Sequence, residues 1–159
     1  MDIKKLDESL FQDMSSHYME LYHFPPLTAN IFTYLMFDFE QKGITFEEIL
    51  EASCASKSSV SNALNVLQQS NYVEVISKLG ERKRYYRVNK SIFKIQFQDS
   101  ISKLKRNYSI LERFAEKRRK ALNFEDINSE KIDLHLELQK KTIKLFEETL
   151  EKINQIKNK

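Results

Sequence analysis

The feature that most constrains the fold of this chain is a long stretch, from Ser91 to Leu122, without glycine or proline. Apolar residues recur within it at alternating spacings of four and three, namely Phe97, Ile101, Leu104, Tyr108, Leu111 and Ala115. This spacing is typical of a helix that carries a heptad seam. After a polar break at 123–129, a second repeat runs from Ile132 to Ile153, with an added apolar stripe at Leu134, Leu138 and Leu145. Two such helices need packing partners.

Composition and charge narrow the class of protein. Of 159 residues, 41% are hydrophobic and 31% charged, with two glycines and two prolines, which favours a helix-rich globular chain. One cysteine excludes an internal disulfide, the first twenty residues are charged throughout, and no run of about 18 apolar residues occurs. We therefore expect a cytoplasmic protein without a membrane span. Positive charge gathers in 54–124, whereas 1–53 are acidic, which indicates a local surface for a polyanion.

The first half of the chain predicts three helices. Residues 2–22 have helical apolar spacing, and the two prolines at 25 and 26 interrupt it, with Pro26 suited to the first turn of the next helix. That helix spans 27–39 and is expected to end with Gly43 in a left-handed cap. Thr45 and Glu48 have the spacing of a capping box, which opens a helix to Ala52.

A polar helix and a hairpin follow. Residues 56–69 place Val60, Ala63, Leu64 and Leu67 on one face, and the opposite face carries hydroxyl and amide side chains without an acid. Strand-forming runs at 72–76 and 84–88 flank a turn at Gly80 and predict a β-hairpin. Three helices followed by a hairpin is the order of a winged helix-turn-helix, so the predicted fold class is mainly α with a small β-hairpin wing and long flanking helices.

This order of elements predicts a DNA-binding site. The helix at 56–69 is suited to enter a major groove about 12 Å wide, with small polar groups facing the bases. The basic hairpin tip is suited to contact phosphates or the minor groove, and Glu81 is expected to orient Arg82 or Arg84 through an ion pair. The candidate DNA-binding residues are Ser56, Lys57, Ser58, Ser59, Ser61, Asn62, Asn65, Lys78, Arg82, Lys83 and Arg84.

Three segments carry a resemblance to a known family. They are Phe24-Pro25-Pro26-Leu27, Ala55-Ser56-Lys57-Ser58-Ser59-Val60-Ser61 and Gly80-Glu81-Arg82-Lys83-Arg84-Tyr85-Tyr86. Over about residues 20–120 the chain resembles winged-helix regulators of the MarR superfamily, in particular its GbsR-like branch. The resemblance implies a homodimer on a pseudo-palindromic operator that represses neighbouring genes until an effector releases it. The long C-terminal helix at 129–157 departs from shorter members of the family.

The predicted organisation has three parts. Residues 1–24 form a dimerisation helix, 25–90 the winged helix-turn-helix, and 91–159 a C-terminal helical dimerisation region. Two chains would hold their recognition helices roughly 34 Å apart, one turn of DNA. Two alternatives stay open, a protein–protein adaptor built on a winged helix and coiled coil, and a nonspecific architectural DNA-binding protein. Only specific DNA binding predicts both salt dependence and discrimination between sequences.

Other chemistry has less support in the sequence. A small-molecule effector could sit in an aromatic cage, for which the candidates are Tyr18, Tyr22, Phe24, Phe32 and Phe37, although aromatics at helical spacing are more often core. Cys54 precedes the recognition helix, where a redox role competes with that of a small buried filler. The three histidines lack metal-ligand spacing, and no catalytic motif occurs. We expect no enzyme activity, metal or cofactor.

Overall fold

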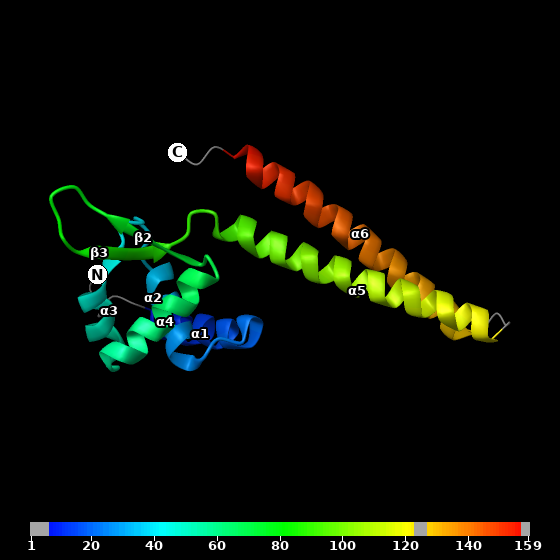
Figure 1. Cartoon of the computed structure of the whole chain (residues 1–159), viewed down its shortest axis with the longest axis horizontal. Helices are drawn as coiled ribbons and strands as arrows, with labels where there is room; N and C mark the ends of the chain where they lie inside the picture. The colour runs from blue at the N-terminus through cyan, green and yellow to red at the C-terminus, as the bar shows by residue number, and fades with distance from the viewer. Residues whose placement is uncertain (1–6, 123–126, 157–159) are drawn as a thin grey trace. The chain divides into compact units, whose positions relative to one another are not determined.

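The computed structural model describes residues 7–122 and 127–156, and the chain divides after Ile92 into two units (Figure 1). The first unit holds a winged helix-turn-helix and the second holds two long helices, so the predicted fold class is confirmed. In the described ranges, none of the helices combines the length and apolarity needed to cross a membrane. The elements are α1 (Glu8–Tyr22), α2 (Pro26–Met36), β1 (Ile44–Thr45), α3 (Phe46–Ser53), α4 (Lys57–Gln69), β2 (Val73–Ser77), β3 (Arg84–Val88), α5 (Ile92–Leu122) and α6 (Ile127–Gln155).

Helix α1 begins later than its apolar pattern predicted. Asp7 has an extended backbone, and its carboxylate accepts a hydrogen bond from the Leu10 N–H at 3.0 Å, which makes it the N-cap. A short carboxylate satisfies amide donors that the first turn leaves free, so the helix begins at Glu8 instead of Asp2. The rest of the predicted start, residues 2–6, lies outside the described residues.

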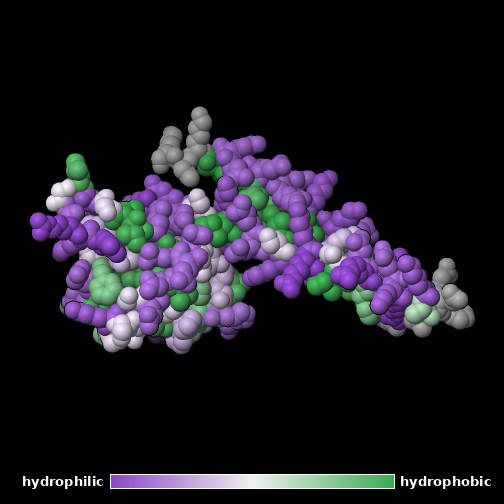
Figure 2. Space-filling model, in the orientation of Figure 1, coloured by the Kyte–Doolittle hydropathy of each residue, from purple (hydrophilic) through white to green (hydrophobic). Residues whose placement is uncertain are grey.

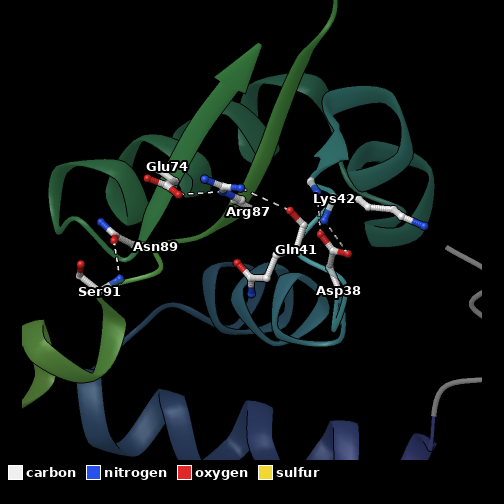
Figure 3. A network of polar contacts seen from close by, with 8 residues as sticks. Asp38, Gln41, Lys42, Glu74, Arg87, Asn89 and Ser91 are labelled. Carbon is white, nitrogen blue, oxygen red and sulfur yellow. Dashed lines mark hydrogen bonds and ion pairs between the residues drawn. The ribbon is translucent and has the colours of Figure 1, made fainter. Parts of the chain in front are cut away.

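Helix α2 begins as expected and ends early. Pro26 is its first residue, which confirms the prediction, but the helix ends at Met36 and not at Phe39. The Asp38 carboxylate accepts hydrogen bonds from the backbone N–H groups of Lys42 and Gly43, at 3.3 and 2.6 Å (Figure 3). These bonds stabilise a turn that leads into the sheet, so Gly43 is not a helix cap.

Gly43 is required for a different reason. Its φ is +81°, and a Cβ at this position would lie 2.9 Å from the Cβ of Tyr85 on β3. A glycine therefore permits both the left-handed backbone and the close approach of the two segments.

Helices α3 and α4 are capped by their own sequence. Thr45 and Glu48 form the predicted capping box at the start of α3, which runs one residue beyond the predicted end at Ala52. Ser56 caps α4 through the N–H of Ser59, at 3.2 Å. Helix α4 ends where Asn71 adopts a φ of +57° and the Tyr72 N–H returns to the Leu67 carbonyl at 2.9 Å. Local hydrogen bonds thus set both ends of the predicted recognition helix.

The sheet has three antiparallel strands in the order β1-β3-β2. The predicted hairpin is present, with Val75 opposite Tyr86, and β2 lies one residue later than expected. The two-residue strand β1 was not predicted. At the base of the hairpin, Arg87 Nε donates to Glu74 Oε1 at 2.7 Å, and its Nη1 donates to the Gln41 carbonyl at 3.4 Å (Figure 3). Arg87 thereby ties the hairpin to the loop before β1.

The core of the first unit lies between the helices and the sheet. The predicted inner face of α4, Val60, Ala63, Leu64 and Leu67, is buried, as are Ile31 and Leu35 of α2 and Ile49 of α3. Burying each large aliphatic side chain contributes about 1.5–3 kcal/mol. This packing holds α4 by one face only and leaves its other face at the surface.

The second unit is an antiparallel pair of helices. The rings of Phe97 and Phe146 lie 5.4 Å apart, early in α5 and late in α6, and Arg119 Nη2 lies 3.1 Å from Asp133 Oδ1 at the other end. The predicted seams face each other within this chain, with Ile101, Ala115 and Leu136 buried. Helix α6 is already helical at Ile127, within the expected polar break, whereas 123–126 and the predicted end at 157 lie outside the described residues.

Candidate nucleic-acid interface

The outer face of α4 is polar, uncharged and accessible. Its side chains Ser58, Ser61, Asn62 and Asn65 are exposed, on the opposite side from the buried face of this helix. Hydroxyl and amide groups can both donate and accept hydrogen bonds, which is what contact with base edges requires. Val66 is also exposed on α4, one turn after Asn62, and could contact a thymine methyl group. The sequence pattern did not single out this residue.

The first turn of α4 forms a serine cluster. Ser56 Oγ lies 2.9 Å from both Ser58 Oγ and Ser59 Oγ. The Ser56 hydroxyl accepts from the Ser59 N–H at the positive end of the helix dipole, and the exposed Lys57 adds a charge there. The N-terminus of α4 is therefore suited to a phosphate group, while Ser61, Asn62 and Asn65 are the predicted residues free of the cap.

The wing tip is a four-residue turn. The Lys78 carbonyl accepts a hydrogen bond from the Glu81 N–H at 3.1 Å, and Gly80 has a φ of +83°. Tyr85 lies below this turn and contacts both of its ends. The Lys78 ammonium is 3.6 Å from the centre of the Tyr85 ring, and the Tyr85 hydroxyl donates to the Glu81 carboxylate. The expected ion pair from Glu81 to Arg82 or Arg84 is therefore wrong, because Glu81 binds Tyr85 instead.

This arrangement leaves the cations of the wing available. Arg82, Lys83 and Arg84 are exposed, and across the described ranges neither arginine forms an ion pair. Free guanidinium groups can each bind a phosphate with two hydrogen bonds. The hydrogen bond to Glu81 also raises the pKa of Tyr85, so the phenol stays neutral at ordinary pH.

An acidic groove lies beside the wing and limits where a polyanion can bind. It encloses about 810 Å³ and is lined by five carboxylates, opposite Lys42, Lys78 and Lys83; these are Asp38, Glu40, Glu47, Glu48 and Glu51. At Glu48, burial alone would raise the pKa, but the hydrogen bonds from Thr45 outweigh it and lower the pKa, which keeps this carboxylate charged. DNA would be repelled from this groove.

The candidate aromatic cage is a packed cluster. The rings of Tyr18 and Phe32 are 4.9 Å apart, and Tyr22 lies 5.3 Å from Phe24 and 5.0 Å from Tyr72. Phe37 lies apart from them, 6.1 Å from Phe11. The contacting rings occupy one another's faces, the packing typical of a core. An effector role for these residues stays a prediction.

A cavity does lie between α1 and the winged domain, with a different lining. It measures about 250 Å³ and is bordered mainly by α1, α2 and α3; its lining includes Phe11, Gln12, Asn30, Ile31, Tyr34 and Ile49. Burial raises the pKa of Tyr34, and the negative charges of Glu48 and Glu51 raise it further. A neutral phenol is therefore present at the cavity wall as a hydrogen-bond donor.

Cys54 lies at the end of α3 and not at the start of α4. It is the C-cap of α3 with a φ of +49°, it is exposed, and its thiol lies 3.8 Å from the Glu51 carbonyl. The interpretation as a buried filler is therefore wrong, and a redox role stays a prediction. Among the residues that the structure describes, no cluster of metal-ligating side chains occurs.

Comparisons with known proteins give the fold. No family model and no curated protein matches the sequence. A crystal structure described as a transcriptional regulator superimposes with a TM-score of 0.62 at 17% identity, over 93% of this chain and 97% of the other. Weaker likenesses are the S. aureus MepR–DNA complex (TM-score 0.44, 14% identity, 71% and 93% covered) and a MarR/EmrR family regulator from Acinetobacter sp. ADP1 (0.41, 20%, 90% and 91%). The similar structures are thus transcriptional regulators.

Proposed function

We propose that this protein is a sequence-specific DNA-binding transcriptional regulator of the MarR type, with the GbsR-like branch as its nearest resemblance. The observation that carries the proposal is the pairing, in one unit, of an uncharged polar outer face on α4 with a wing whose acid is bound to Tyr85. Asn62 and Asn65 would contact base edges, while Lys57, Arg82, Lys83 and Arg84 would bind phosphates. The protein would act as a repressor without enzymatic activity.

We further propose that the regulator is a homodimer held by one flank of the α5–α6 pair. The seam spacing assigns Ile101 and Ala115 to heptad position a, so that Lys105 and Arg119 fall at position e. Both are ion-paired across the two helices, Lys105 Nζ to Glu147 Oε1 at 2.6 Å and Arg119 to Asp133. In an antiparallel pair the e positions of both helices share one flank and the g positions share the other.

The g positions of this pair lack acidic and basic residues apart from His135, and their flank is partly apolar. Position g holds Phe93, Ser100, Asn107, Phe114, Ala121, His135, Thr142 and Thr149. The adjoining c positions add the apolar Ile110, Leu138 and Leu145, with Lys103, Lys117, Lys131 and Lys152 between or beyond them. Phe114 is 56% exposed and Leu138 60%, and hydrophobic atoms are visible along the long helices in Figure 2. A second copy would cover this flank, because exposed apolar side chains grouped along one side of a helix pair mark an interaction surface. Helix α1 exposes Leu10 and Leu21, and we propose that it takes part in dimerisation on its own account.

An effector of the proposed regulator would bind in the 250 Å³ cavity. Phe11, Ile31 and Ile49 favour an apolar body, while Tyr34 and Asn30 can fix a polar group. Ile49 belongs to α3, which leads directly into α4. A ligand would change DNA affinity only by binding the two arrangements of these helices with different affinity.

The test is selection of DNA fragments from the source genome by the full chain, followed by binding measurements over a range of salt. We expect a recurrent palindromic site. The logarithm of the binding constant should fall linearly with the logarithm of the salt concentration, with a slope set by the number of phosphates that the protein neutralises. Asn62→Ala should reduce discrimination by about tenfold per affected base pair. Arg82→Ala should weaken binding to all sequences and flatten the salt slope.

The two alternatives give different outcomes in the same experiment. A salt-dependent affinity without a recurrent site would identify an architectural DNA-binding protein. Absence of both would favour a protein–protein adaptor and would overturn the proposal.

A further inference from the structure

An apolar side chain occupies the tip of the basic wing. Leu79 is fully exposed, with a relative accessibility of 106%, and its turn is flanked by Lys78 and Arg82. Hydrophobic atoms project at the end of the β2–β3 hairpin in Figure 2. A single exposed leucine needs no explanation by itself, but at the tip of the proposed DNA-binding wing it is placed to contact DNA.

The turn presents Leu79 at the end of the hairpin. The hydrogen bond from the Glu81 N–H to the Lys78 carbonyl makes Leu79 the second residue of the turn, and the positive φ of Gly80 suits the third position. A Cβ on Gly80 would meet no atom within 4 Å. The tip is therefore narrow, and no side chain in the described ranges covers Leu79.

Tyr85 holds this tip from below. Its ring contacts the Lys78 ammonium, and its hydroxyl binds Glu81, so both ends of the turn are tied to one side chain of β3. The turn thus carries an ordered backbone, an acid that is hydrogen-bonded to Tyr85, and a free apolar end. Little conformational freedom would be lost on inserting such a tip into a groove.

We propose that Leu79 enters the minor groove beside the major groove occupied by α4, and that it selects A·T over G·C pairs there; this rests on the proposed DNA-binding function. The minor groove of an A·T pair presents only acceptors, whereas guanine adds its 2-amino donor. Leu79 would cover that donor without offering an acceptor, and an unsatisfied donor is costly. Leucine also serves as a wedge between base steps in known minor-groove binders.

The experiment uses a DNA fragment selected by the full-length protein, with the base pairs beneath the wing changed from A·T to G·C or to inosine·cytosine. Inosine lacks the 2-amino group but keeps the major-groove edge of guanine. We expect the G·C fragment to bind about tenfold more weakly and the inosine fragment to recover most of the affinity. Leu79→Gln, which has a polar group able to bind the amino donor, should remove this difference, and Leu79→Met should retain it.

The outcomes separate the two proposals. Specific binding by the wild-type chain with equal affinities for the G·C and inosine fragments would overturn the role of Leu79 and leave the DNA-binding function intact. Identical discrimination by Leu79→Gln and wild type would do the same. If the wild-type chain selects no DNA sequence, both proposals fail.

Discussion

The hydroxyl of Tyr85 donates a hydrogen bond to the carboxylate of Glu81, four residues earlier in the same wing. This contact gives the one carboxylate of the wing tip a phenol partner, and that carboxylate forms no ion pair with the exposed Arg82, Lys83 or Arg84. The electrostatics of the wing therefore depend on an aromatic side chain, which counting charges along the sequence does not detect.

Replacing Tyr85 with phenylalanine should weaken DNA binding without unfolding the wing. The ring and its contact with Lys78 remain, but Glu81 is free to pair with an arginine or to repel phosphates. We expect about a fivefold loss of affinity for all sequences at low salt, smaller at high salt because the effect is screened. The double variant Tyr85→Phe, Glu81→Gln should regain wild-type affinity, measured by fluorescence anisotropy. Equal affinities of wild type and Tyr85→Phe would contradict this role of the hydrogen bond.

The same contact predicts a titration. Because the hydrogen bond to Glu81 stabilises the neutral phenol, the pKa of Tyr85 is raised above its ordinary 10.0. Glu81→Gln should lower the pKa toward that value, so that Tyr85 ionises at a lower pH than in the wild type. Ultraviolet absorbance titration checks this, with the Tyr85→Phe variant identifying which signal belongs to Tyr85. No displacement of that signal would count against the hydrogen bond.

The two glycines allow a matched comparison of backbone strain and steric clash. Both have positive φ, +81° at Gly43 and +83° at Gly80, but only at Gly43 would a Cβ meet the Tyr85 Cβ at 2.9 Å. We expect Gly80→Ala to cost about 1 kcal/mol of unfolding free energy, from φ alone. Gly43→Ala should cost about 3 kcal/mol, because overpacking adds to the strain. Urea denaturation measures both, and equal costs would show that the contact with Tyr85 relaxes freely.

The capping box of α3 should make stability depend on pH. The hydrogen bonds from Thr45 lower the pKa of Glu48 below its ordinary 4.5. A carboxylate whose pKa is lower in the folded than in the unfolded state stabilises the fold at any pH above its unfolded pKa. This stability is lost as the pH falls through the folded pKa. Thr45→Ala should cost about 1 kcal/mol at pH 7, and its difference from wild type should shrink below pH 4.5. Glu47→Gln, in the same turn, is the control, and a difference independent of pH would exclude this linkage.

The g flank of the α5–α6 pair should decide the oligomeric state. Phe114→Lys places a charge on the apolar flank, where a second copy would bury it without a partner. We expect the dimer dissociation constant to rise at least about a hundredfold, measured by sedimentation equilibrium. Gln98→Lys adds the same charge at an exposed e position and should leave the dimer intact. A monomeric wild type, or equal effects of both variants, would contradict the assignment of this flank.

Helix ends were predictable where a few neighbouring residues control them. Pro26 and the Thr45–Glu48 box act through hydrogen bonds or backbone restrictions within four residues, so their positions in the sequence are sufficient evidence. Asp7 shows the limit, because the apolar pattern continued past it while its carboxylate stopped the helix. The outer face of α4 was also predictable, since helical periodicity separates it from the buried face.

The wing was predictable as a hairpin but not in its contacts. Strand β1 has two residues and exists because β3 offers it an edge, through pairs such as Ile44 with Tyr86. The true role of Gly43 depends on the same approach, which joins segments about forty residues apart along the chain. A sequence pattern carries little information about such a distant partner.

The sequence by itself determined that this chain forms a winged helix-turn-helix with long helices, because periodicity, caps and turns are local properties. Only the tertiary structure decided that the heptad seams of α5 and α6 cover each other, and that Glu81 binds Tyr85 and not an arginine. An apolar helix face indicates that it will be buried but not which element will cover it. A carboxylate likewise indicates that it needs a partner but not which residue supplies that partner. Those choices depend on the distances that folding creates.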